Sequence, residues 1–266
     1  MPPNARLRRR VGYFFASEAH SRREVAEFAD LLLALGPTAV IGGCIRDLHL
    51  AGNRRFRSDV DFVVDPASMP AFERLVGRLG GTANRFGGWG IGLGRWKADV
   101  WALERTWAAA AGHVTVSSLD DLLGTTFFDW DAILYSLADR RLTEDGAWFD
   151  RIRRRVIDIN LAPNPNPLGN AVRALRYACR WEAALGERLA AHVCGQIRDH
   201  GWDAIAARER SAFPVQFLAG VDGGAVARTL LAHGRSGGTV RLPLKPSPNP
   251  LRQLRARSPE SRGVFI

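Results

Sequence analysis

The segment from Thr38 to Asp65 contains the residue types and spacings that chemistry on a phosphate group needs. Gly42 and Gly43 interrupt a short apolar run where a strand must turn into a helix. Glycines let the backbone approach a ligand, and the free N–H groups at a helix start face a bound anion. Arg46 falls in the first turn of that helix and can reach phosphate oxygens in a bidentate manner. We predict a phosphate-binding corner here, although a glycine pair alone more often marks a simple turn.

Two aspartates follow on the next predicted strand. Side chains alternate along a strand, so Asp59 and Asp61 share one face while their apolar neighbours enter the core. Carboxylates about 7 Å apart can both lean toward a pair of Mg²⁺ or Mn²⁺ ions, which bridge phosphate oxygens and polarise an attacking hydroxyl. Asp99, on a later predicted strand, is the candidate for a third metal ligand. The competing interpretations are a solvated strand face for the pair and, for Asp99, an exposed acid that balances Lys97 or Arg95.

These residues resemble the head domain shared by bacterial poly(A) polymerases and CCA-adding tRNA nucleotidyltransferases. The family pattern is a glycine pair, an Arg-Asp step and a strand with two aspartates one residue apart, which GGCIRD and SDVDFVVD match. The resemblance implies an α/β (α+β) fold, with a mixed-sheet head followed by a small all-helical neck and body. It also implies that Asp59 and Asp61 hold the metal ions, that Gly43 and Arg46 contact the incoming nucleotide and that Asp99 supplies the further acid.

The likeness extends to a predicted neck helix that begins near Pro167. Arg173 and Arg176 coincide with two of the three regularly spaced arginines of the family's helix. The resemblance implies that both approach the tail or the base of the nucleotide. Asn170 replaces the first arginine and Pro167 replaces the acid, and in the CCA-adding enzymes these two positions resemble a template that selects cytosine or adenine. Nucleotidyl transfer is therefore a firmer expectation than CCA addition.

The predicted reaction is attack of a hydroxyl on the α-phosphate of a nucleoside triphosphate, with release of pyrophosphate. The leading acceptor is the 3′ end of an RNA such as tRNA. A nucleotidyltransferase that modifies a protein or small-molecule hydroxyl is an open alternative, because the body is small and the base-selecting pair is absent. A degenerate RNA- or nucleotide-binding module is another, although intact Asp59, Asp61 and Arg46 argue against it. The sequence specifies neither the preferred base nor the oligomeric state.

Charge and cysteine content set further bounds on this chain. The net charge of +10 resides at the two ends, since four arginines lie in the first ten residues and the last 33 are also strongly basic. Basic ends add salt-dependent affinity for RNA phosphates, or they only keep an arginine-rich protein in solution. The three cysteines are scattered, which indicates neither a disulfide frame nor a zinc site. No apolar run reaches the length of a membrane span, so a cytoplasmic protein without a membrane partner is expected.

Four segments are expected along the chain. They are a basic N-terminal arm over residues 1–24, the nucleotidyltransferase head over 25–162, the helical neck and body over 163–233 and a basic, Pro-rich, disordered tail over 234–266. Within the head, the patterns predict helices over 18–35, 69–79, 119–123 and 130–137, with hairpin strands over 86–103. An arginine cluster near the end of the head fits either an RNA path or a charged edge strand, and it comprises Arg151, Arg153, Arg154 and Arg155.

Overall fold

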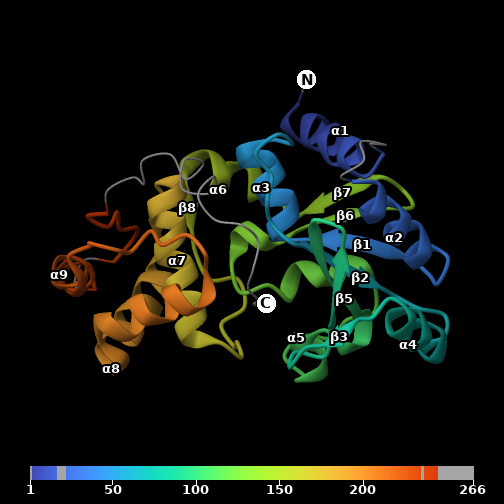
Figure 1. Cartoon of the computed structure of the whole chain (residues 1–266). Coiled ribbons are helices and arrows are strands. Elements are labelled where there is room, and N and C mark those ends of the chain that lie inside the picture. The colour runs from blue at the N-terminus through green and yellow to red at the C-terminus, as the bar shows by residue number, and fades with distance from the viewer. Residues whose placement is uncertain (1, 17–21, 235–236, 245–266) are drawn as a thin grey trace. The chain divides into compact units, whose positions relative to one another are not determined.

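The computed structural model describes residues 2–16, 22–234 and 237–244, and Figure 1 labels its helices and strands. The chain divides into two compact units, of which the first covers residues 1–149 and the second begins at Asp150. The division falls before the predicted boundary at residues 162 and 163. The tail prediction for residues 235–236 and 245–266 lies outside the described residues.

A mixed β-sheet forms the frame of the first unit and confirms the predicted fold class. Among the described residues it has seven strands, in the order β3-β4-β5-β2-β1-β6-β7. Strands β2 and β5 run parallel, and the other neighbouring pairs are antiparallel. The strands are β1 (Thr38–Ile41), β2 (Val60–Val64), β3 (Thr82–Ala83), β4 (Trp89–Leu93), β5 (Trp96–Ala102), β6 (Ile133–Ser136) and β7 (Arg141–Glu144).

Helices of the first unit connect and cover these strands. They are α1 (Pro3–Ala16), α2 (Arg23–Leu33), α3 (Gly43–Ala51), α4 (Met69–Arg78) and α5 (Trp107–Ala110), with the 3₁₀ segments η1 (Leu103–Arg105), η2 (Leu119–Gly124) and η3 (Asp129–Asp131). The predicted N-terminal arm contains helix α1, whose buried stripe consists of Leu7, Val11 and Phe14. This i, i+4, i+7 spacing places the three side chains on one helical face. Helix α1 contacts α3 and α2, so it is part of the packed unit.

The two faces of strand β2 have different environments. Phe62 lies on the face covered by α1 and α2, where its ring is 6.0 Å from the ring of Phe15 and 5.3 Å from that of Phe28. Val63, on the opposite face, belongs to an apolar cluster with Leu122 of η2 and Leu134 of β6. Asp59 and Asp61 share the Val63 face, because side chains alternate along a strand.

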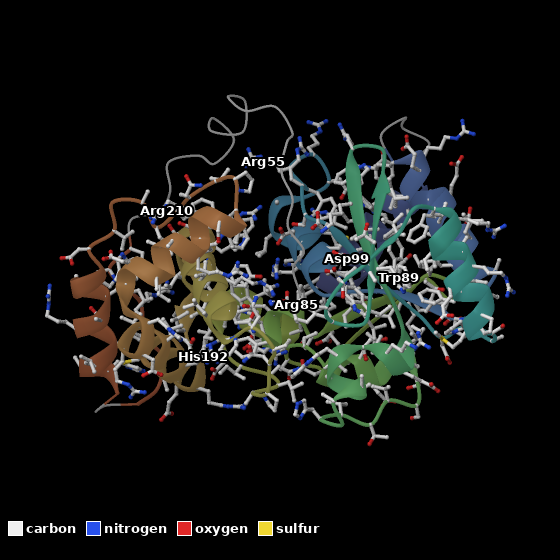
Figure 2. The ribbon with its side chains drawn as sticks, turned by 60° about the horizontal axis from the view of Figure 1, so that its bottom comes forward. Arg55, Arg85, Trp89, Asp99, His192 and Arg210 are labelled. Atoms are coloured by element: carbon white, nitrogen blue, oxygen red, sulfur yellow. The ribbon has the colours of Figure 1, made fainter. Side chains whose placement is uncertain are left out.

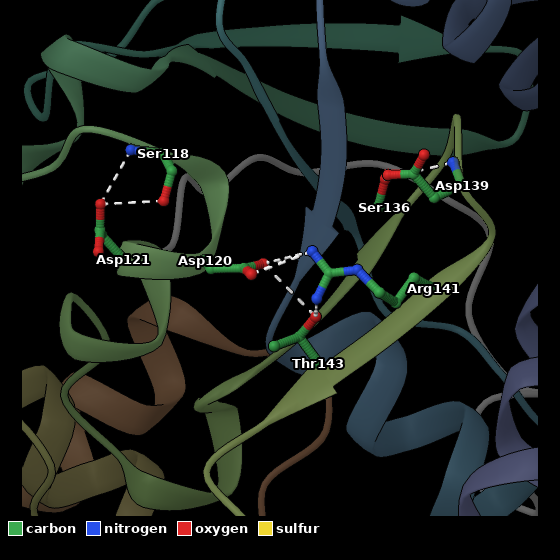
Figure 3. A network of polar contacts seen from close by, with 7 residues as sticks. All are labelled: Ser118, Asp120, Asp121, Ser136, Asp139, Arg141 and Thr143. Carbon is green, nitrogen blue, oxygen red and sulfur yellow. Dashed lines mark hydrogen bonds and ion pairs between the residues drawn. The ribbon is translucent and has the colours of Figure 1, made fainter.

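Segment η2 is attached to the sheet by polar contacts, which Figure 3 shows. The Ser118 side chain and the Asp121 carboxylate form a capping box at the start of η2. Arg141 of β7 donates hydrogen bonds of 2.9 and 3.0 Å to the two carboxylate oxygens of Asp120. These contacts hold η2 in place over Val63, on the sheet face that also carries Asp59 and Asp61.

The prediction of a helix over residues 130–137 is wrong. Ile133–Ser136 forms strand β6, which pairs with both β1 and β7. An apolar run of this length fits a buried strand as well as a helix, and only the neighbouring strands decide between them. The predicted hairpin over 86–103 is confirmed, since β4 and β5 pair antiparallel.

The second unit is mainly helical. Its elements are α6 (Trp148–Arg154), which begins in the first unit, β8 (Val156–Ile157), α7 (Pro167–Trp181), β9 (Ala184–Leu185), α8 (Glu187–Ala212) and α9 (Gly223–His233). Helix α8 kinks at Gly201, whose φ is +78°. Val240 and Leu185 exchange backbone hydrogen bonds of 2.8 Å, so the predicted tail is paired with β9 at Val240. None of the described helices is long and apolar enough to cross a membrane.

Candidate active site

The glycine corner lies where strand β1 passes into helix α3. Gly42 is the residue before the helix and has φ +68°, a conformation that only glycine adopts without strain. Its N–H donates a 2.9 Å hydrogen bond to the Ile133 carbonyl of β6, which fixes the corner to the sheet. Gly43 opens the helix, as the sequence predicts.

Strand register places the corner next to the acidic residues. On the antiparallel side Asp61 is opposite Ile41, the residue that precedes the corner, and on the parallel side Asp61 is opposite Asp99. Side chains of directly opposite residues project to the same face of a sheet and have Cβ atoms about 5 Å apart. Asp61 therefore stands between the glycine corner and Asp99.

The Lys97 ammonium brings Asp59 and Asp99 together. It lies 3.7 Å from Oδ2 of Asp59 and 3.5 Å from Oδ2 of Asp99. Lys97 precedes Asp99 by two residues on β5, and Asp59, just before β2, precedes Asp61 by two residues, so all four side chains lie on the same side of the sheet. Figure 2 shows Asp99 among the strands of the first unit. The interpretation of Asp99 as an exposed acid is wrong, because its side chain is 1% exposed.

Burial dominates the electrostatics of this acidic face. It raises the pKa of Asp59 and of Asp99 above the usual value of an aspartate, and the nearby Lys97 ammonium opposes the rise at both. The charge of Asp59 raises the pKa of Asp99 further. The Asp59 side chain is 41% exposed, whereas Asp99 is inaccessible to solvent. Negative charge is thus held in this face against an unfavourable desolvation energy.

Arg46 lies in the first turn of α3, next to the acidic face, but its environment is different. Its guanidinium is buried, donates a 2.9 Å hydrogen bond to Asp47 and forms an ion pair with Asp131 of η3. Ser58 donates a hydrogen bond to the other carboxylate oxygen of Asp47. The Arg46 guanidinium also lies 3.4 Å from the point that a Cβ on Gly43 would occupy. Arg46 therefore stabilises the glycine corner from the interior of the protein.

Sequence reasoning missed three of these residues. Asp47 enters the sequence pattern only as part of the Arg-Asp step, and no motif singles out Asp131. Lys97 is expected only as a neighbour that balances Asp99. The alternation of Lys97 and Asp99 on one strand could have placed the ammonium on the acidic face.

The donor set fits a divalent cation chemically. Asp59, Asp61 and Asp99 offer the carboxylate oxygens that Mg²⁺ and Mn²⁺ prefer, and the Lys97 ammonium marks a point between two of them where positive charge is held. Within the described ranges, no three acidic, histidine or cysteine side chains converge closely enough to surround one ion. A metal bound by all three carboxylates therefore requires their side chains to turn toward one another.

The two neck arginines lie on helix α7 of the second unit. Arg176 is 13% exposed, donates a 2.5 Å hydrogen bond to Glu209 and packs over the ring of Phe213 at 3.8 Å. Burial lowers the pKa of this guanidinium. Arg173 is half-buried on the same helix. Arg176 thus holds the helices of its own unit together, and its predicted contact with a nucleotide stays a prediction.

Comparison with known proteins shows similarity to solved structures. No family model matches the chain, and no curated protein does. A CCA-adding enzyme in complex with CTP shares the fold with a TM-score of 0.50 and 18% identity, over 95% of this chain and 53% of that one. A tRNA-processing enzyme with CTP has a TM-score of 0.44 and 21% identity over 65% of this chain and 46% of that one. The Thermotoga maritima CCA-adding enzyme bound to tRNA has a TM-score of 0.45 and 19% identity over 86% and 50% of the two chains. The chain thus spans about half the length of these enzymes.

Proposed function

We propose that the protein is a metal-dependent nucleotidyltransferase, which transfers a nucleoside monophosphate from a nucleoside triphosphate to the 3′ hydroxyl of an RNA, with tRNA as the leading acceptor. The 3′ oxygen forms a bond to the α-phosphorus, and the bond from that phosphorus to the bridging oxygen of the β-phosphate breaks. Pyrophosphate leaves, and the hydroxyl proton passes to solvent. No covalent enzyme intermediate is needed, because positioning and charge neutralisation carry the reaction.

One observation carries this proposal: the register that sets the glycine corner, Asp61 and Asp99 side by side on one sheet face. A triphosphate at the corner has its phosphorus atoms next to the carboxylates. Asp59, Asp61 and Asp99 would hold Mg²⁺ or Mn²⁺, which would neutralise the phosphate charge and polarise the attacking hydroxyl. The fold shared with a CCA-adding enzyme at 18% identity is consistent with this assignment.

The remaining predicted residues have separate roles in the proposal. Gly42 and Gly43 hold the triphosphate through their backbone N–H groups. Arg46 stabilises the glycine corner from the protein interior, and its positive charge favours bound phosphate. Arg173 and Arg176 of α7 are proposed to approach the tail or base of the nucleotide, and within its own unit Arg176 also pairs with Glu209. The CCA-adding enzyme in complex with CTP suggests CTP as the first triphosphate to test.

The direct test is a transfer assay with defined substrates. The protein is incubated with each of the four α-labelled nucleoside triphosphates, Mg²⁺ or Mn²⁺ and a mixed tRNA pool, and the products are separated into RNA, protein and small molecules. Label in RNA supports the proposal and shows the preferred base. Label in purified protein or in a small molecule instead supports a different acceptor hydroxyl. Undiminished labelling in excess chelator contradicts the metal dependence.

A further inference from the structure

A hollow of about 810 Å³ opens on the surface of the first unit, between helix α1 and the loop that follows α3. Six of the residues that line it are arginines, and none of its described lining residues is acidic. They are Arg6, Arg9, Arg10, Arg22, Arg54 and Arg55. We call this surface the arginine hollow. None of its lining residues belongs to the acidic face or the glycine corner, so the proposed reaction gives it no role.

Packing of α1 explains how these arginines gather. The buried stripe of α1 faces the unit, which leaves Arg6, Arg9 and Tyr13 on the outer side at spacings of three and four residues. Gly52, at φ +73°, turns the chain out of α3 into the loop that carries the other two exposed arginines. Phe56 anchors this loop, because its buried ring packs 5.0 Å from the ring of Phe14 on α1. The wall of the hollow is therefore fixed by the apolar core.

Two of the six arginines belong to this frame. Arg10 donates hydrogen bonds of 2.8 and 3.0 Å to the carbonyl oxygens of Leu48 and His49 near the end of α3. Arg22 donates a 3.0 Å hydrogen bond to the Asn53 carbonyl of the loop. Both guanidinium groups hold the two sides of the hollow together, and both carry their charge into it.

The other four arginines have no such partners. Arg6, Arg9, Arg54 and Arg55 are exposed, and their side chains form no hydrogen bond or ion pair with any residue that the structure describes. Like charges gathered on a fixed frame repel one another until an anion enters. Burial lowers the pKa of the Arg22 guanidinium, Tyr13 opposes this, and the nearby charges of Arg95 and Arg57 add to the lowering.

We propose that the arginine hollow binds the phosphate backbone of RNA. Guanidinium groups match phosphate oxygens in bidentate geometry, and several of them spread over a wide hollow suit a chain of phosphates better than a single one. Tyr13, which lines the same hollow and is 62% exposed, offers a ring on which a base can stack. A stacking ring beside phosphate-binding cations favours nucleic acid over an anionic membrane or inorganic polyphosphate.

The hollow is linked to the acidic face by a short piece of chain. The loop that carries Arg54 and Arg55 continues through Phe56 to Asp59, the first of the three aspartates. Figure 2 shows Arg55 apart from Asp99, so the two are separate sites of the same unit. If the proposed function holds, this RNA is the acceptor, and the hollow grips it upstream of the reacting 3′ end. This last step rests on the proposed function, whereas RNA binding does not.

The test compares double substitutions that remove the same charge from different places. Arg6→Ser with Arg9→Ser changes the helix side of the hollow, and Arg54→Ser with Arg55→Ser changes the loop side. Arg74→Ser with Arg78→Ser is the matched control, because both residues are exposed on α4 and have no partner among the described residues. Binding to a fluorescent single-stranded RNA and to mixed tRNA is measured by anisotropy over a range of KCl concentrations, without triphosphate or divalent ion.

Each hollow variant should weaken RNA binding about tenfold at low salt and reduce the slope of log affinity against log salt by about one or more, because two phosphate contacts are lost. The control should keep the wild-type slope, and circular dichroism should show that all three variants are folded. Equal losses in the control, wild-type affinity in both hollow variants, or binding of phosphatidylserine vesicles with unchanged RNA binding would each overturn the proposal. RNA binding is measured without triphosphate or divalent ion, so a failed transfer assay leaves this result intact.

Discussion

The glycine corner and the acidic face lie side by side in the first unit, but their charges have different partners. At the corner, the Arg46 guanidinium contacts Asp47 at 2.9 Å and also pairs with Asp131, all within the protein interior. On the acidic face, Lys97 approaches Asp59 and Asp99 only to 3.7 and 3.5 Å. Charge-assisted hydrogen bonds are shorter, at about 2.7–2.9 Å. The ion pairs at the corner therefore stabilise the fold, whereas the carboxylates of the acidic face are held less closely by Lys97 and are left to bind a ligand.

The largest effect should come from breaking the corner. Arg46→Ala leaves Asp47 and Asp131 buried without their cation, and losing one partner of a buried ion pair costs about 3–5 kcal/mol of unfolding free energy. Urea denaturation measures it, with exposed Arg74→Ala as control, for which a change within about 0.5 kcal/mol is expected. An Arg46→Ala protein as stable as wild type would show that the corner is not a structural charge network.

The acidic face should respond in the opposite direction. Asp99→Asn should lower nucleotidyl transfer by more than about 100-fold. Residues that only support metal ligands cost about 10–100-fold when changed, and a ligand should cost more. Its stability at neutral pH should stay level or increase. The pKa of Asp99 is raised in the folded protein, so the folded state disfavours its charged form above that pKa and gains stability as pH falls through it. Thermal unfolding at neutral and acidic pH, beside the transfer rate, checks both; a large loss of stability at neutral pH would contradict the assignment.

Alanine substitutions at the two glycines of the corner should have smaller effects, on stability at Gly42 and on KM at Gly43. Gly42→Ala forces a side chain onto a backbone with φ +68° and should cost about 1–3 kcal/mol of stability. At Gly43 a Cβ meets Arg46 no closer than 3.4 Å, an ordinary contact, so Gly43→Ala should fold normally. If phosphate approaches this backbone, Gly43→Ala should instead raise KM for the triphosphate. Equal stability and equal KM for both variants would leave the corner without its proposed role.

The smallest effect concerns Lys97 and pH. The Lys97 ammonium opposes the raised pKa of Asp59 and of Asp99, so Lys97→Met should raise both pKa values further. The acidic limb of the transfer rate, where these carboxylates lose their charge, should then move to higher pH. Lys97→Arg keeps the charge and should leave the limb in place. If the acidic limb does not move in Lys97→Met, the Lys97 charge does not influence the carboxylates that transfer requires.

Much of the head could be predicted from its sequence because local patterns decide it. The alternation around Asp59 and Asp61 specifies a strand face, and the glycines specify a break before a helix. The opposition of Asp61 and Asp99 depends on parallel pairing of β2 with β5, which no local pattern contains. Sequence position suggested Asp99 as the third acid, but only the register shows how close it is.

The errors arise where tertiary contacts decide. The apolar run of β6 is a strand because it lies between β1 and β7, although it also fits a helix. The arginines of the first residues predict a basic arm, but the spacing of Leu7, Val11 and Phe14 indicates a packed helix. The structural roles of Arg46 and Arg176 could not be separated from ligand binding, since Asp131 and Glu209, which pair with them, are 85 and 33 residues away in the sequence.

The central claim is that the carboxylates beside the glycine corner carry nucleotidyl transfer. Its most direct test is the metal-dependent transfer rate of Asp61→Asn, measured beside Asp65→Asn, which changes an exposed acid at the end of the same strand. We predict that Asp61→Asn loses transfer while its melting temperature stays at the wild-type value, and that Asp65→Asn keeps the wild-type rate. A folded Asp61→Asn protein that transfers nucleotides at the wild-type rate would contradict the account.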